Sequence, residues 1–241
     1  MEVRLSDFEW QLSWLQRHFE LVDLPKALAA RGSPASDRMA VLSFDDGYRD
    51  QFTVGFPVLH DLKIPFILYL TTRQVETGEP LGPASAAPLR WTELAEMAAT
   101  GLMTVGAHTH SHPDLRLLDS AAVERELETS DELIRSRLGV DPHHFAYPWG
   151  YWSAIADPHI RKRYETATVG AGPPLTEASD HYTLSRIPIQ LSDGRFFFRR
   201  KLEKGLRLEE AVRRRIKGYK PPPIIPTSFP PDGGTPPSDL G

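Results

Sequence analysis

The chain has 241 residues, of which 40% are hydrophobic and 25% charged, a composition typical of a soluble globular protein with one sizeable core. Its formal net charge of −4 is too small to indicate nucleic acid or another strongly charged polymer as a partner. It has no cysteine, so any metal must be held by His, Asp or Glu. No stretch approaches the ~18 uncharged apolar residues of a spanning helix, and the first residues do not resemble a secretory signal. Localisation and oligomeric state stay open.

Apolar periodicity and turn residues divide the chain into alternating helices and strands. Ser6 and Asp7 are placed to cap the first helix, and Gly139 to end the longest one. Each strand is a short, continuous apolar run, as in strands buried on both faces. In chain order, the expected elements are helix 8–19, helix 24–30, strand 38–44, helix 52–62, strand 65–70, loop 78–88, helix 91–100, strand 102–107, helix 120–138, strand 144–147, helix 154–164 and strand 166–170.

Buried strands that alternate with helices predict an α/β fold with a parallel sheet covered by helices. Parallel α/β folds carry their chemistry at the C-terminal ends of the strands. Three polar clusters stand at such ends in this chain, after Phe44, after Ala107 and after Tyr147. We therefore expect the three clusters to meet at one edge of the sheet and to form an active site there.

The C-terminal part of the chain differs in composition from the rest. Residues 201–220 are basic and have a helical pattern, which indicates a solvated helix face or, alternatively, a contact with anionic lipid or polymer. Residues 221–241 contain eight prolines, and such a segment cannot bury enough surface to fold. We expect a catalytic domain over 1–200, a basic helix over 201–220 and a disordered tail over 221–241.

The first cluster is the run Ser43-Phe-Asp-Asp-Gly47. Two adjacent carboxylates can have separate roles: one can bind a metal, and the other can contact a water bound to that metal. Gly47 permits the tight turn that leaves both carboxylates facing a cleft. Taken alone, the run is also compatible with an ordinary solvated turn.

The second cluster is His108-Thr-His-Ser-His112, which holds three of the nine histidines of the chain. Neutral imidazole is the commonest ligand for a divalent metal in a protein without cysteine. His108 and His112 stand four residues apart, so a turn-like segment brings both to one side. His110 would join them on a strand but points elsewhere on a turn, and we take it as a non-ligand. A surface histidine cluster is the alternative.

The third cluster is Phe145-Ala-Tyr-Pro-Trp-Gly150. Aromatic side chains around a Pro-Gly turn can form the wall of a sugar site, because aromatic faces pack against the C–H surfaces of sugars. A buried turn at a strand end is the alternative interpretation of this run.

In this order and on these elements, the three clusters resemble the polysaccharide deacetylase family, the NodB-homology domain. The family pattern is Thr/Ser-Phe-Asp-Asp-Gly, then His-Ser/Thr-x-x-His, then Phe-x-x-Pro-x-Gly. The likeness covers roughly residues 5 to 195. It implies a distorted (β/α) barrel fold and an enzyme that hydrolyses N-acetyl groups from an N-acetylated polysaccharide or oligosaccharide.

The resemblance also implies roles for single residues. Asp46, His108 and His112 match the metal ligands, most often for Zn²⁺ or another divalent transition metal. Asp45 matches the general base, which takes a proton as water attacks the acetyl carbonyl. The backbone N–H of Trp149 matches the donor to the oxyanion. The binding site for the substrate is expected to include Tyr147, Pro148 and Trp149.

Two features depart from the family pattern. Many members have an Arg after the Phe of the third motif, where it orients the base, and this chain has Ala146 there. The usual histidine that acts as general acid near the C-terminal end is missing, since the last histidine is His181. The Phe-Ala-Tyr-Pro form is similar to the branch that acts on β-1,6-linked poly-N-acetylglucosamine. In that branch the acid lies in an N-terminal Tyr-His strand, upstream of a Phe-x-x-x-Leu-x-x-Leu helix.

This chain has that helix as Phe8, Leu12 and Leu15, only a few residues after Met1. We therefore expect a barrel that lacks its first strand and its general acid, and that catalyses poorly. Its open edge would be covered by another copy or by other residues of the chain. A carbohydrate-binding relic is the alternative function. A metal-dependent amidohydrolase is a weaker one, because that family needs its histidine pair on the first barrel strand.

Overall fold

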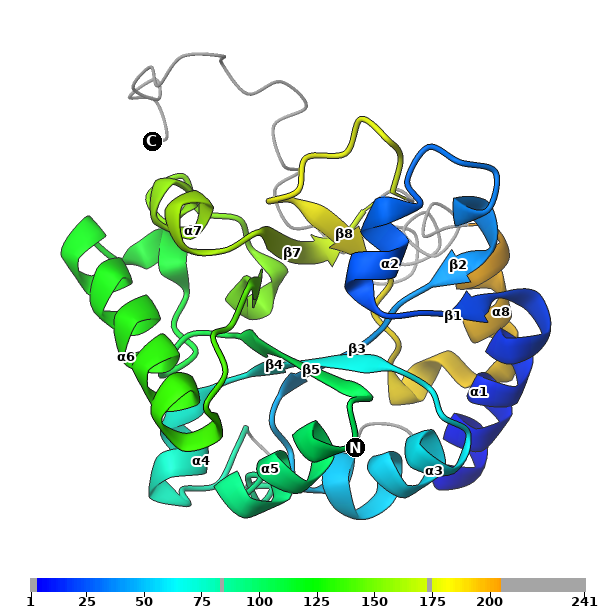
Figure 1. Cartoon of the computed structure of the whole chain (residues 1–241), viewed down its shortest axis with the longest axis horizontal. Coiled ribbons are helices and arrows are strands. Elements are labelled where there is room, and N and C mark those ends of the chain that lie inside the picture. The colour runs from blue at the N-terminus through cyan, green and yellow to red at the C-terminus, as the bar shows by residue number, and fades with distance from the viewer. Residues whose placement is uncertain (1–3, 83–84, 173–174, 205–241) are drawn as a thin grey trace.

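A six-stranded parallel sheet forms the centre of the computed structural model, which describes residues 4–82, 85–172 and 175–204 (Figure 1). The strands lie in chain order, and each pairs in parallel with the next. They are β3 (Leu42–Asp46), β4 (Phe66–Leu70), β5 (Met103–Ala107), β6 (His144–Ala146), β7 (Thr166–Ala171) and β8 (Leu184–Arg186). Within the described residues, β3 and β8 have no further strand beyond them, so the curled sheet is an incomplete (β/α) barrel, as the sequence predicts.

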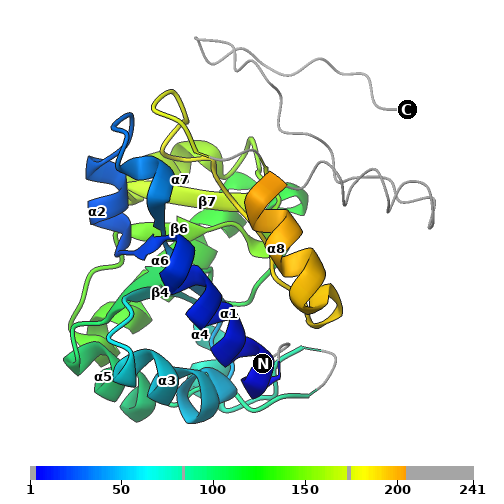
Figure 2. The same cartoon turned by 90° about the vertical axis from the view of Figure 1, so that its right-hand side faces the viewer.

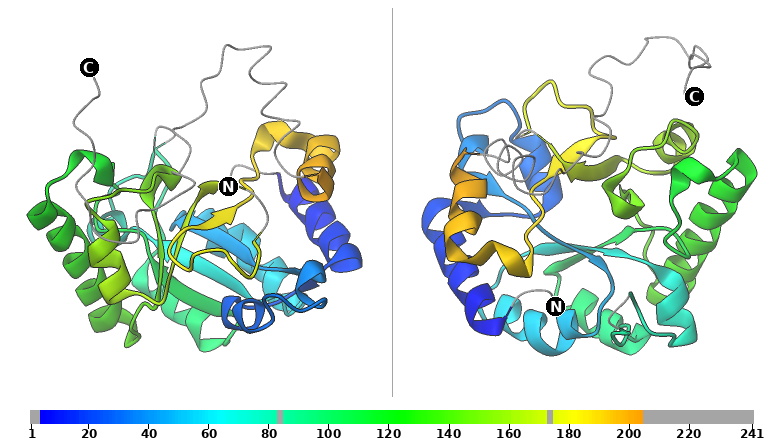
Figure 3. Two further views of the ribbon diagram at one scale, coloured as in Figure 1. Left: turned by 90° about the horizontal axis from the view of Figure 1, so that it is seen from above. Right: turned by 180° about the vertical axis from the view of Figure 1, so that it is seen from behind.

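Helices cover the outer face of this sheet (Figures 1 and 3). The α-helices of the layer are α1 (Leu5–His18), α3 (Phe56–Asp61), α4 (Thr72–Thr77), α5 (Trp91–Ala99), α6 (Ser120–Leu138), α7 (Asp157–Arg163) and α8 (Gly194–Lys204). A π-helical turn over Gln51–Gly55 precedes α3, and short 3₁₀ turns cover Ser36–Arg38, Leu115–Leu117, Pro148–Gly150 and Leu191–Asp193. None of the helices within the described ranges has the length and apolar character needed to cross a membrane.

The longest helix, α6, shows how the local sequence sets the bounds of an element. The Asp119 side chain accepts a hydrogen bond from the backbone N–H of Ala122, which caps the first turn. Gly139 ends the helix in the left-handed conformation, with φ 70°. Val123 and Leu127 lie on the buried face and pack into the main core between helices and sheet. The helix therefore has the predicted bounds, 120–138.

The strands present alternate side chains to two different apolar clusters. Phe66, Leu68 and Leu70 of β4 face the helices and belong to the main core. Ile67 and Tyr69 point the other way and form a small cluster inside the curl of the sheet, which also holds Ala146, Leu184 and Leu24. Both faces of β4 are therefore buried, which explains its continuous apolar sequence.

The side of the barrel between β3 and β8 is covered by the helix α2 (Leu24–Ala29), which Figure 1 shows between β8 and β2. Strand β2 (Met39–Ala40) pairs only with β1 (Glu20–Leu21), in a separate two-stranded sheet. Leu24 packs into the inner cluster. The Arg31 side chain, just after α2, donates hydrogen bonds to two backbone carbonyls of the segment before β8. Other residues of the chain thus cover the open edge, one of the two expected outcomes.

The N-terminal helix starts earlier than predicted. It begins at Leu5, with Arg4 in the capping position, so Ser6 and Asp7 lie inside its first turn and do not cap it. The prediction of these two residues as caps was wrong because a third polar residue, Arg4, takes up the extended conformation that a cap requires.

The C-terminal basic helix also begins earlier than predicted. Helix α8 runs from Gly194 to Lys204, whereas the sequence pattern places its start at 201. The rest of the predicted helix and the Pro-rich segment 221–241 lie outside the described residues. Strand β8 is only three residues long and was not predicted.

Candidate metal centre

The two aspartates of the first motif are the last residues of β3. Asp45 pairs in register with Tyr69, whose side chain lies inside the barrel, so the Asp45 carboxylate points inward as well. On a regular strand Asp46 would point outward. Its backbone instead takes a left-handed conformation, with φ 72°, and Gly47 follows with φ 93°. This turn directs both carboxylates to the same end of the barrel, as the motif predicts.

His108 directly follows β5 and is held in one orientation. Its backbone N–H donates to the carbonyl of Leu70 on the neighbouring strand, and the side chain is almost fully buried. The Nδ1 atom lies 2.7 Å from the carbonyl oxygen of Ala146. Because a carbonyl can only accept, Nδ1 must carry the proton, which leaves the Nε2 lone pair free to face the carboxylate of Asp46.

His112 is positioned by a tight loop. Thr109 and His112 both have left-handed backbone conformations, with φ of 68° and 59°. Glu126 on α6 holds the loop, since its carboxylate accepts hydrogen bonds from the backbone N–H groups of His110 and Ser111 and from the Ser111 hydroxyl. The two strained residues thus persist because the loop is anchored from outside.

The three predicted ligands come together. The Nε2 atoms of His108 and His112 lie 3.5 Å and 3.4 Å from one Asp46 oxygen, and the three ligand atoms lie within 4.8 Å of one another. Two ligands bound to zinc at tetrahedral angles are separated by about 3.4 Å. Burial lowers the pKa of both histidines, more than the neighbouring carboxylates raise it, and so favours neutral imidazole. The donor set therefore fits one divalent ion.

His110 lies apart from this group. Its Nδ1 atom is 3.0 Å from the hydroxyl of Thr72 on α4, and it is not one of the three grouped ligands. The second motif thus divides into two converging histidines and one that packs against a neighbouring helix.

Asp45 forms a bidentate ion pair with Arg186 at the end of β8, with N–O distances of 2.6 Å and 2.8 Å. Burial raises the pKa of Asp45, but Arg186 and the two histidines more than offset this, so the pKa lies below its ordinary value. Asp45 is therefore ionised at neutral pH and held in a fixed orientation beside the ligands.

The sequence pattern did not identify Arg186 as a site residue. The only indication of such a residue was indirect. The third motif has Ala146 where the family pattern has the arginine that orients the base, so an arginine with that role would have to come from another strand end. The pair also joins β8 to β3 across the open side of the barrel. His181 cannot play a part here, because its carbonyl accepts from Ala167 near the opposite, N-terminal end of β7.

The third motif forms a turn that presents one aromatic ring. The Trp149 side chain is 63% exposed, and its ring lies 4.9 Å from that of His112. Gly150 lies so close to β7 that an added Cβ would come within 2.6 Å of the Cα of Gly170. Tyr147 and Pro148 are buried, Tyr147 against Phe145. Of the three residues predicted to contact the sugar, only Trp149 is exposed.

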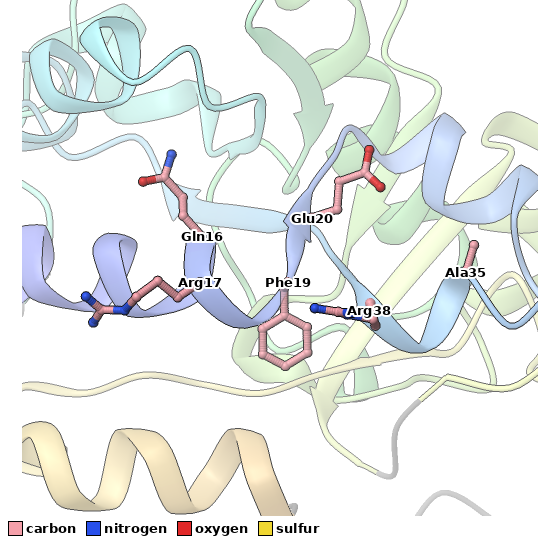
Figure 4. Close-up of a pocket in the computed structure, with 6 residues that line it drawn as sticks. All are labelled: Gln16, Arg17, Phe19, Glu20, Ala35 and Arg38. Atoms are coloured by element: carbon pink, nitrogen blue, oxygen red, sulfur yellow. The ribbon is translucent and has the colours of Figure 1, made fainter.

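A separate hollow lies between the C-terminal end of α1 and the turn before β2. It is lined by Gln16, Arg17, Phe19, Glu20, Ala35 and Arg38 (Figure 4). These residues precede or begin β1 and β2, so the hollow lies at the N-terminal ends of these two strands and contains none of the predicted site residues.

Comparison with known proteins agrees with this geometry. The profile of the family described as polysaccharide deacetylase matches residues 32–165, more than half of the chain. Poly-beta-1,6-N-acetyl-D-glucosamine N-deacetylase of Escherichia coli strain K12 is 26% identical over 200 residues. That alignment covers 67% of this chain but only 30% of the relative, so the chain spans less than a third of that protein.

Solved structures share the fold. A Streptococcus pyogenes deacetylase, PplD, in complex with acetate, superposes with a TM-score of 0.71 at 23% identity, covering 83% of this chain and 88% of that one. The structure of IcaB from Ammonifex degensii gives 0.69 at 22% identity, covering 78% and 85%. From the family profile, with the three motifs gathered at one end of such a barrel, the chain belongs to the polysaccharide deacetylase family.

Proposed function

We propose that this chain hydrolyses N-acetyl groups of a polysaccharide rich in N-acetylglucosamine, with a divalent ion held by Asp46, His108 and His112. The observation that carries the proposal is the fit of these three ligand atoms to one ion, directly beside an ionised, oriented carboxylate. When bound, the ion would polarise the acetyl carbonyl and make a water more acidic. The relative that acts on poly-beta-1,6-N-acetyl-D-glucosamine supports this class of substrate.

Residues of the chain itself supply the proton acceptor, the oxyanion donor and the sugar contact of the proposed reaction. Asp45 takes the proton of the attacking water, and Arg186 keeps that carboxylate ionised and aimed at the water. The backbone N–H of Trp149 is the proposed donor to the oxyanion. The exposed Trp149 ring offers an apolar face to a sugar ring next to the ligands.

The test measures acetate release from N-acetylglucosamine oligomers, together with bound metal. Asp46→Ala should lose both the metal and the activity, because it removes one of three ligands. Asp45→Asn should keep the metal and lose nearly all turnover, by a factor on the order of 10²–10⁴. Equal turnover of the Asp45→Asn variant and the parent would refute the role of the base.

The same experiment separates the enzyme from a carbohydrate-binding relic. A relic would bind metal and oligomer but release no acetate with any metal supplied.

A second experiment compares the variants Arg186→Lys and Arg186→Met. Lysine retains the charge but not the bidentate geometry, so we expect it to recover only part of the turnover that methionine loses. Full activity of Arg186→Met would contradict the role of Arg186.

A further inference from the structure

Helix α8 lies beside α1 and packs against it (Figure 2). Phe198 is 2% exposed and makes edge contacts with the rings of Trp10 and Trp14. On the same side, the buried Lys201 ammonium donates to Asp193 and to the carbonyl of Pro188. These contacts fix the helix and determine which of its side chains must face outward.

The outward side of α8 combines bare aromatic rings with arginines. Phe196 is 63% exposed and Phe197 is 44% exposed. Arg199 is more than half exposed, and the Arg200 guanidinium lies over the Phe196 ring, 5.5 Å from its centre. Arg195 is also more than half exposed but lies at the edge of the contact with α1, where its guanidinium is 5.1 Å from the centre of the Trp10 ring. The ion pairs of Arg195 and Arg199 with acidic neighbours are 3.5 Å long and on the surface, so they are weak and can be exchanged.

Charge is distributed very unevenly between the sequence from 194 to 220 and the rest of the chain. Residues 194–220 hold eleven Lys and Arg against three Glu, a net charge of +8, although the whole chain has −4. The other 214 residues therefore carry −12. Both a second copy of this face and the basic sequence after 204 would be repelled by α8, so neither is a suitable partner for it.

The partner must supply negative charge and an apolar phase together. An acidic polymer would satisfy the arginines but would not bury two phenylalanine rings. Anionic phospholipid satisfies the arginines and buries the rings. Basic residues are attracted to its headgroups, and aromatic rings insert at the boundary between headgroups and acyl chains. We propose that α8 docks the protein on the surface of an anionic lipid bilayer through Phe196, Phe197 and the flanking arginines.

Such docking would bring the metal centre close to the bilayer. Arg195 pairs with Asp7 in the first turn of α1, and the next residue, Phe8, packs against Phe44. Phe44 directly precedes Asp45. The exposed rings therefore lie at the same end of the barrel as the ligands.

Sedimentation of the full chain with lipid vesicles tests the proposal. We expect binding to vesicles of phosphatidylglycerol and phosphatidylcholine, little binding to phosphatidylcholine alone, and release in 0.5 M salt. The double variant Phe196→Ser/Phe197→Ser should bind the anionic vesicles at least about tenfold more weakly. Leu62→Ser is the matched control, because Leu62 is 42% exposed at the opposite end of the barrel and should not affect binding.

Circular dichroism and the midpoint of thermal unfolding check that each variant is folded. Arg199→Gln/Arg200→Gln gives a second measure and should weaken binding while leaving Phe196 and Phe197 in place. Three results would overturn the proposal: no vesicle binding by the parent, equal binding to neutral vesicles, or undiminished binding by the Phe196→Ser/Phe197→Ser variant. Binding to an acidic polysaccharide without binding to vesicles would overturn it too.

Discussion

Asp131 is a buried carboxyl group whose ionisation should cost this protein stability. It lies on α6, 6% exposed, accepts a hydrogen bond of 2.8 Å from the Tyr164 hydroxyl and has Arg163 at 3.6 Å. Burial raises its pKa from 3.8 to about 6, because the hydrogen bond and the arginine only partly offset the loss of water. Asp131→Asn removes the charge and keeps an oxygen that can accept from Tyr164.

The size and sign of the effect follow from this shift. Below pH ~4 the carboxyl is protonated in both states and contributes nothing. As the pH rises toward 6 the folded state holds its proton longer than the unfolded state, so the free energy of unfolding falls. Above pH ~6 the loss is complete, at about 3 kcal/mol for a shift of about two units. Asp131→Asn should therefore match the parent near pH 4 and exceed its stability by up to ~3 kcal/mol at pH 7.5.

Urea unfolding at constant ionic strength between pH 4.5 and 7.5 measures this difference. Glu132→Gln, at the next and exposed position, is the control with the same change of charge, and its difference from the parent should stay within about 0.5 kcal/mol at every pH. The reasoning is refuted if the Asp131→Asn difference is constant with pH, or if that variant is the less stable protein at pH 7.5.

Three further predictions concern the site. Glu126→Ala leaves two backbone N–H groups of the His112 loop without their acceptor and should weaken zinc binding by ~10–100-fold in a chelator competition, whereas Glu128→Ala on the exposed side of α6 should not. Gly150→Ala adds a Cβ 2.6 Å from β7 at a φ of +70° and should lower the free energy of unfolding by at least about 2 kcal/mol in urea; an unchanged midpoint would show that the turn can relax. Trp149→Ala keeps the backbone N–H but removes the ring, so KM for oligomers should rise while kcat changes little; the opposite pattern would argue against a role in sugar binding.

The convergence of Asp46, His108 and His112 could be predicted because each stands at or shortly after the C-terminal end of a strand, and parallel strands place such residues at one edge. The strand alternation also shows why Tyr147, a predicted sugar contact, is buried. It stands two residues after Phe145, so it shares the face of Phe145 and is buried with it against the helices. The next turn, which begins with Pro148, is where the chain reverses and brings Trp149 to the surface.

Arg186 could not be found in this way. Its strand has only three residues, too few for periodicity to show, and its partner Asp45 lies 141 residues away in the sequence. Nothing local in a Leu-Ser-Arg run distinguishes a partly buried, ion-paired arginine from a solvated one. Similarly, the turn at Asp46 depends on a left-handed backbone conformation, which is uncommon for a residue other than glycine. The surrounding structure imposes this conformation, and the residue type does not predict it.

The link between Asp45 and Arg186 has a consequence for the order in which the parts of the site assemble as the chain is synthesised. The three proposed metal ligands lie before residue 113, and the groups that hold the two histidines, the Glu126 carboxylate and the Ala146 carbonyl, lie before residue 147. Arg186 is added 40 residues after Ala146, at roughly 5–20 residues per second. Until β8 docks, Asp45 lacks the guanidinium that orients it, so under the proposed function the metal ligands can be in place before the base is, and the docking of β8 completes the site.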